Sequence, residues 1–142
     1  MASISPEARA ETRVLVVDDD PQSVRMLTRI LEEGGFGEVA TSTDSSAVVA
    51  LCEAEDGPDL LLLDLTMPGL DGFEVLEGLA DCVAADPPLR VVVLTGHEHP
   101  AIARRAADLG ASAVIGKTTP RDRLLESLDA VIREDAGDET TS

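Results

Sequence analysis

The chain has 142 residues, enough for one domain with a single buried core. Acidic residues outnumber basic ones by 28 to 11, and the formal net charge of −17 repels phosphate backbones and anionic lipids. The sequence contains two Phe and neither Tyr nor Trp, so it offers no aromatic platforms for single-stranded nucleic acid. We therefore expect this chain to bind neither nucleic acid nor membranes directly.

The sequence carries no segment that predicts export or membrane insertion. No stretch approaches the roughly 18 apolar residues of a membrane span, and residues 1–13 lack the apolar core of a signal peptide. Two cysteines, Cys52 and Cys82, are too few for a disulfide framework in a chain of this length, and we expect both to be reduced. These features predict a soluble, cytoplasmic protein.

Five segments predict β-strands. Four are unbroken apolar runs, the pattern of strands buried on both faces of a parallel sheet, and one that follows a glycine turn is weaker. In chain order they are Val14–Val17, Glu38–Thr41 (the weaker one), Leu60–Leu63, Val91–Leu94 and Ala113–Ile115.

Helical patterns follow these strands. Apolar residues recur at helical spacing within Val24–Leu31 and Leu124–Ile132. Prolines suit helix starts and Gly34 a helix end, and an acidic capping box precedes the third helix. These positions are Pro21, Pro100 and Pro120 for the starts, and Asp71 with Glu74 for the box. Strand followed by helix, five times over, predicts a doubly wound α/β sandwich.

Polar groups follow the predicted strands where ligands bind in such folds. The first strand ends in the acidic run Asp18–Asp20, the third in Asp64, the fourth in Thr95, and the fifth in Gly116 followed by Lys117. Lys117 is the single lysine of the sequence. Each group alone has a structural explanation, such as helix capping by Asp20 or a solvated loop lysine. Capping does not explain why all of them fall at one edge of the sheet.

A metal and a phosphoryl group would explain this gathering. If the first and third strands are neighbours, Asp18, Asp19 and Asp64 converge, and clustered carboxylates repel unless a cation is present. Mg²⁺ prefers oxygen ligands and accepts phosphate oxygens, and Mn²⁺ is an alternative ion. Asp64 is then the expected nucleophile, since a carboxylate can form an aspartyl phosphate. Thr95 would hydrogen-bond the phosphoryl group and Lys117 would neutralise its charge, while Gly96 leaves the approach open.

Four motifs give the sequence a resemblance to a known family. They are Val16–Asp19, Asp64–Gly72, Leu94–Gly96, and Gly110–Ser112 leading to Lys117. Through them the sequence resembles the receiver domain of bacterial two-component response regulators, of which the chemotaxis receiver is the minimal form. The resemblance covers roughly residues 13 to 134, and the block from Asp64 to Gly72 is its most specific part.

The resemblance implies a fold and a mechanism. The implied fold is a flavodoxin-like (βα)5 sandwich with a five-stranded parallel sheet in the order 2-1-3-4-5. A sensor histidine kinase or a phosphotransfer protein would phosphorylate Asp64, and Asp18, Asp19, Asp64 and the backbone carbonyl of Thr66 would hold Mg²⁺. Thr66 and His97 would also lie near the hydrolytic water and set the lifetime of the signal. The domain would catalyse its own phosphorylation and dephosphorylation, yet act mainly as a switch.

The resemblance also implies a domain organisation. Residues 13–134 would form the receiver domain, residues 1–12 a polar N-terminal tail, and residues 135–142 a polar C-terminal tail or the start of a linker. No output domain follows the last predicted helix. The chain is therefore expected to signal either as a stand-alone receiver to a downstream protein or as one domain of a longer regulator.

Two positions depart from the family pattern. Lys117 is followed by Thr118 where receivers usually carry proline, which puts the characteristic cis peptide bond at that position in doubt. Val114 stands where an aromatic switch residue is common. The phosphorylation chemistry does not depend on these positions, but the readout is expected to differ from the usual one.

Two other functions remain open from the sequence. Asp18 and Asp20 form the Asp-x-Asp of haloacid-dehalogenase-type phosphatases, with Asp18 as nucleophile and Asp20 as acid/base. Against this, Gln22 stands where that motif prefers threonine, and no later acidic pair ends a strand. The other alternative is a receiver-fold binding module that is never phosphorylated.

Overall fold

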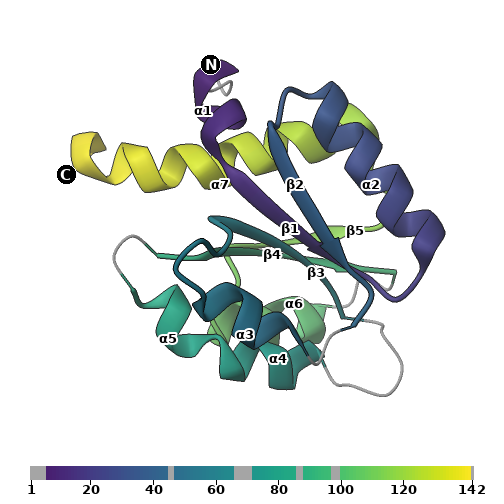
Figure 1. Cartoon of the computed structure of the whole chain (residues 1–142). Helices are drawn as coiled ribbons and strands as arrows, with labels where there is room; N and C mark the ends of the chain where they lie inside the picture. Colours follow the sequence, from purple (N-terminus) through teal and green to yellow (C-terminus); the bar gives the residue numbers. More distant parts are fainter. Residues whose placement is uncertain (1–5, 45–46, 66–71, 86–87, 97–99, 142) are drawn as a thin grey trace.

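The computed structural model describes residues 6–44, 47–65, 72–85, 88–96 and 100–141 (Figure 1). Its centre is a parallel sheet in the order β2-β1-β3-β4-β5. The strands are β1 (Arg13–Val17), β2 (Glu38–Ser42), β3 (Leu60–Asp64), β4 (Arg90–Thr95) and β5 (Ala113–Gly116). The predicted fold class and strand order are confirmed, and each strand boundary lies within one residue of its predicted position.

The unbroken apolar runs are buried because helices cover both faces of the sheet. All residues of β3 are buried, and successive side chains of β1, β3 and β4 alternate between two core clusters. Val16 and Leu62 face one cluster, while Val17 and Leu63 face the other. The predicted weak strand, β2, is the sheet edge and is largely exposed, which explains its weaker apolar pattern.

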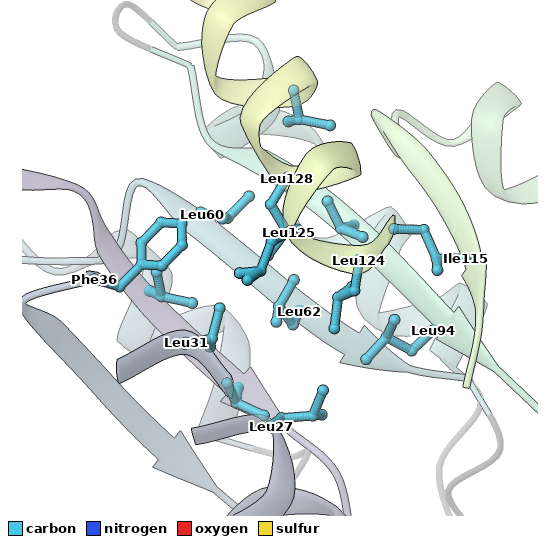
Figure 2. Close-up of a cluster of buried hydrophobic side chains, with 14 residues drawn as sticks. Leu27, Leu31, Phe36, Leu60, Leu62, Leu94, Ile115, Leu124, Leu125 and Leu128 are labelled. Carbon is cyan, nitrogen blue, oxygen red and sulfur yellow. The ribbon is translucent and has the colours of Figure 1, made fainter. Parts of the chain in front are cut away.

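The first core cluster lies between the sheet and the helices α2 (Pro21–Glu33) and α7 (Arg121–Thr141). Figure 2 shows Leu27 and Leu31 of α2 near Leu124, Leu125 and Leu128 of α7 above the central strands. These are the residues of the two predicted apolar stripes. The amphipathic pattern therefore located both helices and the faces they bury.

The second core cluster lies under α3 (Val48–Glu53), α4 (Gly72–Gly78), α5 (Ala80–Val83) and α6 (Pro100–Asp108), on the other face of the sheet (Figure 1). One helix was expected between β3 and β4, and the described residues of this connection form two, α4 and α5. The break falls at buried Leu79, whose N–H donates to both Val75 O and Leu76 O, the shared bond common at a helix end. Gly78, a weak helix former, precedes it.

The predicted helix boundaries are largely confirmed. Asp20 caps α2 by accepting a hydrogen bond from Gln22 N at 3.0 Å, and Pro21 occupies the first turn. Gly34 caps its C-terminus, and Gly35 takes the left-handed conformation with φ 100°. Pro100 begins α6, and Pro120 immediately precedes α7. Asp71 of the predicted capping box lies outside the described residues.

The two ends of the chain have more helix than expected. Residues 1–12 were expected as a polar tail, but Pro6–Glu11 forms helix α1, in which proline opens a run of good helix formers. Arg9 of α1 contacts Asp129 of α7. Helix α7 continues to Thr141 through the segment expected as a C-terminal tail or linker. Within the described residues, no helix is both long enough and apolar enough to cross a membrane.

Candidate functional site

The carboxyl ends of four strands place the predicted site residues at one edge of the sheet. Val17 pairs with Leu63 in the register of β1 and β3, so Asp18, directly after β1, lies beside Asp64, the last residue of β3. Thr95 ends β4 and pairs with Gly116 of β5, and Lys117 follows Gly116. The parallel topology therefore brings together side chains that are up to 99 positions apart in the sequence, from Asp18 to Lys117.

Three carboxylates converge at this edge. Asp18, Asp19 and Asp64 each offer an oxygen atom, and these atoms all lie within 4.8 Å of one another. The side chains of Asp18 and Asp64 are each only 1% exposed, whereas Asp19 is exposed. The cluster thus has a buried floor and one ligand open to solvent, an arrangement that fits a cation bound partly through water.

Lys117 supplies a positive charge to the buried pair. Its Nζ lies 2.9 Å from Asp18 Oδ2 and 3.1 Å from Asp64 Oδ2, and its side chain is 25% exposed. The backbone N–H of Lys117 donates to Thr95 O at 2.8 Å, which fixes the lysine against the end of β4. Thr95 itself is buried.

The electrostatics of the pair reflect burial and mutual proximity. Burial raises the pKa of Asp18, and so does the neighbouring Asp64, while the Asp20 N–H and Lys117 oppose the shift only in part. Burial alone would lower the pKa of Lys117, but its contacts with Asp18 and Asp64 outweigh burial and raise it. The site therefore holds more negative charge than one ammonium group compensates.

The donor set fits a hard divalent cation. Asp18 Oδ1 accepts a hydrogen bond from Asp20 N at 3.0 Å, which orients the carboxylate. Asp18 Oδ2 is buried and pairs with the Lys117 charge without an aligned hydrogen bond. A buried carboxylate oxygen with no aligned hydrogen bond can still coordinate a cation, and one carboxylate oxygen each of Asp18, Asp19 and Asp64 lies within 4.8 Å of the others. The acidic pocket can hold a metal ion.

Asp20 belongs to the helix rather than to the carboxylate cluster. Its Oδ1 accepts from Gln22 N at 3.0 Å and its Oδ2 from the Ser23 hydroxyl at 3.2 Å. Both oxygens therefore satisfy the first turn of α2, as the structural explanation predicted. This engagement weighs against an acid/base role for Asp20.

Some predicted site residues fall outside the described part of the chain. Thr66 and His97 are among them, as is most of the motif block between Asp64 and Gly72. Gly96 is described, and a Cβ atom added there would meet no atom within 4 Å, so the space beside Thr95 is open as expected.

Two features of the structure were not anticipated from the sequence. A cavity of about 160 Å³ adjoins Lys117, between Met26 and Leu27 of α2 and Leu124 of α7. Met26 is exposed and lies outside the predicted apolar stripe of its helix. An apolar residue at such a position was the one feature of the sequence that could have indicated this cavity. Arg9 reaches Asp129 across 120 positions, which no local pattern indicates.

Comparison with known proteins shows which family this chain resembles. The model of the response regulator receiver domain matches residues 14–129. The chain is 35% identical over 122 residues to the transcriptional regulatory protein KdpE of Mycobacterium tuberculosis H37Rv, covering 86% of this chain and 51% of that protein. It is 35% identical over 119 residues to the C4-dicarboxylate transport transcriptional regulatory protein DctD of Pseudomonas aeruginosa, covering 84% and 25%. The chain thus spans a quarter to a half of these relatives.

Solved structures agree with the sequence comparisons. A CheY-like response regulator receiver domain protein from Methanospirillum hungatei JF-1 superposes with a TM-score of 0.77 at 28% identity, covering 89% of this chain and 98% of that one. The signal receiver domain of the putative response regulator NarL from Mycobacterium tuberculosis has a TM-score of 0.71 at 31% identity, covering 86% and 96%.

Proposed function

The chain belongs to the family of response regulator receiver domains, and from this membership we propose that Asp64 accepts a phosphoryl group in a reaction that requires a divalent cation. One observation carries the proposal. One carboxylate oxygen each of Asp18, Asp19 and Asp64 lies within 4.8 Å of the other two, and the Lys117 ammonium contacts two of the three carboxylates. A phosphoryl acceptor needs this combination of a nucleophilic carboxylate and neighbouring positive charge.

In the proposed reaction, an Asp64 oxygen attacks the phosphorus of a phosphohistidine or of a small acyl phosphate. The new P–O bond forms as the donor's P–N or P–O bond breaks, and the leaving group departs with the bonding electrons. The ammonium of Lys117, already 3.1 Å from Asp64 Oδ2, neutralises charge on the transferred group. The Thr95 hydroxyl, at the end of the neighbouring strand, donates to a phosphoryl oxygen.

The proposed cation is Mg²⁺, with Mn²⁺ as a substitute. Asp18, Asp19 and Asp64 would hold it, with the backbone carbonyl of Thr66 as a further ligand in line with the family resemblance. When bound, the ion supplies charge neutralisation for the phosphoryl group. Side chains at Thr66 and His97 are proposed to set the lifetime of the aspartyl phosphate, which the domain would form and hydrolyse by its own chemistry.

The proposed contacts of Thr95 and Lys117 with the phosphoryl group have enough free energy to shift a conformational equilibrium. Shifting a two-state element from 1:99 to 99:1 needs ~5.5 kcal/mol, and hydrogen bonds to charged groups contribute ~1.5–3 kcal/mol each. The Thr95 and Lys117 contacts together have a comparable magnitude. Val114, half-buried against the second core cluster, replaces the usual aromatic residue, so we propose that the signal is read out without a threonine–aromatic couple.

The proposed partners follow from the same chemistry. The donor would be a sensor histidine kinase or a phosphotransfer protein in the cytoplasm, and the output would be a downstream protein or a fused output domain. Residues 13–134 are proposed as the receiver unit. The net charge of −17 favours protein contacts over direct contact with nucleic acid.

The test is the intact mass of the chain after incubation with acetyl phosphate and Mg²⁺. We expect one added phosphoryl group of about 80 Da, with no gain in EDTA or in an Asp64→Asn variant. Asp59→Asn is the matched control, because Asp59 is an exposed carboxylate directly before the same strand that Asp64 ends. It should gain phosphate like the unaltered chain. A folded protein that gains none with any small donor would instead be a receiver-fold binding module.

A further inference from the structure

The two cysteines lie on neighbouring short helices and share one cavity. Cys52 is in α3 and Cys82 in α5, both on the same face of the sheet. A cavity of about 270 Å³ is lined by both residues together with Pro58 and Pro88, which shortly precede β3 and β4. The thiols therefore open into a common space at the amino ends of the strands, away from Asp64 and Thr95.

The two cysteines line the same partly open cavity, where a small molecule can meet both residues. Both side chains are half-buried and pack against the second core cluster, so neither is sealed from solvent. The Leu89 N–H donates to Cys82 O at 2.9 Å, which fixes the backbone of the second cysteine at the cavity wall. Burial and, to a smaller extent, the neighbouring Cys82 raise the pKa of Cys52 to about 12.

We propose that Cys52 and Cys82 form an intramolecular disulfide when the protein meets a low-molecular-weight disulfide. The thiolate of one cysteine attacks a sulfur of the small disulfide, which releases one small thiolate and leaves a mixed disulfide on the protein. The thiolate of the other cysteine then attacks the protein sulfur and releases the second small thiolate. The protein loses two protons and two electrons, and the small disulfide is reduced to two thiols.

The bridge would join α3 and α5, two helices of the same layer. It closes a ring from residue 52 to residue 82 that contains β3 and α4. A ring of this length restricts the unfolded chain, so the disulfide should stabilise the folded protein. Because the pKa of both thiols is raised, little thiolate is present at neutral pH and its attack on the small disulfide is slow. The disulfide should therefore form under sustained rather than brief oxidation.

The experiment uses the full chain and oxidised glutathione as the probe. After incubation, remaining thiols are alkylated under denaturing conditions and the intact mass is measured. We expect a loss of about 2 Da with no alkylation, restored by dithiothreitol, and a rise of several degrees in the midpoint of thermal unfolding. Cys52→Ser and Cys82→Ser should each stop at a single glutathione adduct of about 305 Da on the remaining cysteine.

Three results would overturn the proposal. They are two stable glutathione adducts on the unaltered chain, a disulfide between two chains, and two fully alkylated thiols after prolonged oxidation. Because the unaltered protein gives the decisive mass, the result stands even if a serine variant folds poorly. Neither the proposal nor its test depends on phosphorylation of Asp64.

Discussion

The carboxylate of Asp18 is held in a position that is unfavourable without a cation. It is 1% exposed, it lies beside Asp64, and burial raises its pKa. A carboxyl group whose pKa is raised in the folded state keeps its proton at pH values where the unfolded chain has lost it. Its contribution to the free energy of unfolding therefore decreases as pH rises from the unfolded-state pKa through the folded-state pKa. The buried carboxylate that the proposed cation site requires therefore lowers the stability of the metal-free chain.

An amide at this position should separate stability from metal binding. We expect Asp18→Asn to raise the free energy of unfolding in EDTA by about 1 kcal/mol, because a buried charge is removed while Lys117 keeps its contact with Asp64. The same variant should lose the stabilisation that Mg²⁺ confers on the unaltered chain. Urea unfolding with and without Mg²⁺ measures both effects.

Asp20→Asn is the control for that variant. Asparagine caps helices as well as aspartate does, so this change should leave both unfolding curves within about 0.5 kcal/mol of the unaltered chain. If Asp18→Asn is less stable than the unaltered chain in EDTA, the carboxylate is stabilised by its surroundings and our electrostatic account is contradicted.

The buried thiol of Cys52 should make the stability of the folded chain depend on pH in the alkaline range. Burial raises its pKa from 9.0 to about 12, so the folded chain retains the thiol proton where the unfolded chain has lost it. Stability should therefore fall as pH rises from 9 towards 12. The sequence has no tyrosine and one lysine, so few other groups titrate there. The fall should be shallower in Cys52→Ala, measured by urea unfolding at successive pH values, and an equal slope would contradict the assigned environment.

Individual site residues could be predicted from the sequence where a strand end determines them. The residues that follow the apolar runs are Asp18, Asp64, Thr95 and Lys117. Because the carboxyl ends of parallel strands lie at the same edge of a sheet, these four residues are expected to lie close together, as they do. The contact of Lys117 with two carboxylates could not be predicted, because it depends on a side-chain path that no spacing encodes.

Among the helices, α1 and α7 are joined by a contact that spans most of the chain. The Arg9 guanidinium donates to both carboxylate oxygens of Asp129 and to Gly34 O, and it lies 5.7 Å from the centre of the Phe36 ring. The Asp129 side chain is only 3% exposed. A short helix that is too small to be stable alone is thereby held against the C-terminal helix.

Removal of Arg9 should therefore destabilise the fold. We expect Arg9→Met to lower the free energy of unfolding by about 2 kcal/mol, because Asp129 is left as a buried, unpaired charge, and Arg9→Met with Asp129→Leu to recover most of the loss. Arg121→Ala is the matched control. Its ion pair with Glu33 is half-exposed, so its removal should change stability by less than about 0.5 kcal/mol. Equal losses from the two arginines would contradict this account.

Elements could be predicted to the extent that their own residues determine them. The apolar runs of the strands and the stripes of α2 and α7 are local patterns, and each was located correctly. The break between α4 and α5 was not predicted, because it depends on how buried Leu79 packs. Helix α1 was expected as a tail because its anchor, Asp129, is remote in sequence.

At the scale of the whole molecule, the net charge of −17 opposes compaction. Raising sodium chloride from about 10 to 150 mM shortens the screening length from roughly 30 to 8 Å. We therefore expect the urea midpoint of the metal-free protein to rise over this range. Potassium chloride should give the same rise, since screening does not depend on the cation. A flat or falling midpoint would mean that local ion pairs outweigh the overall repulsion.

The most direct test of the central claim is to find which aspartate carries the phosphoryl group. After treatment with acetyl phosphate and Mg²⁺, borohydride reduces an aspartyl phosphate to homoserine, and peptide mass spectrometry locates the converted residue. Our account predicts conversion at position 64 alone, dependent on the divalent cation. Conversion at Asp18 would instead identify the nucleophile of a haloacid-dehalogenase-type phosphatase and would contradict the assignment of Asp64.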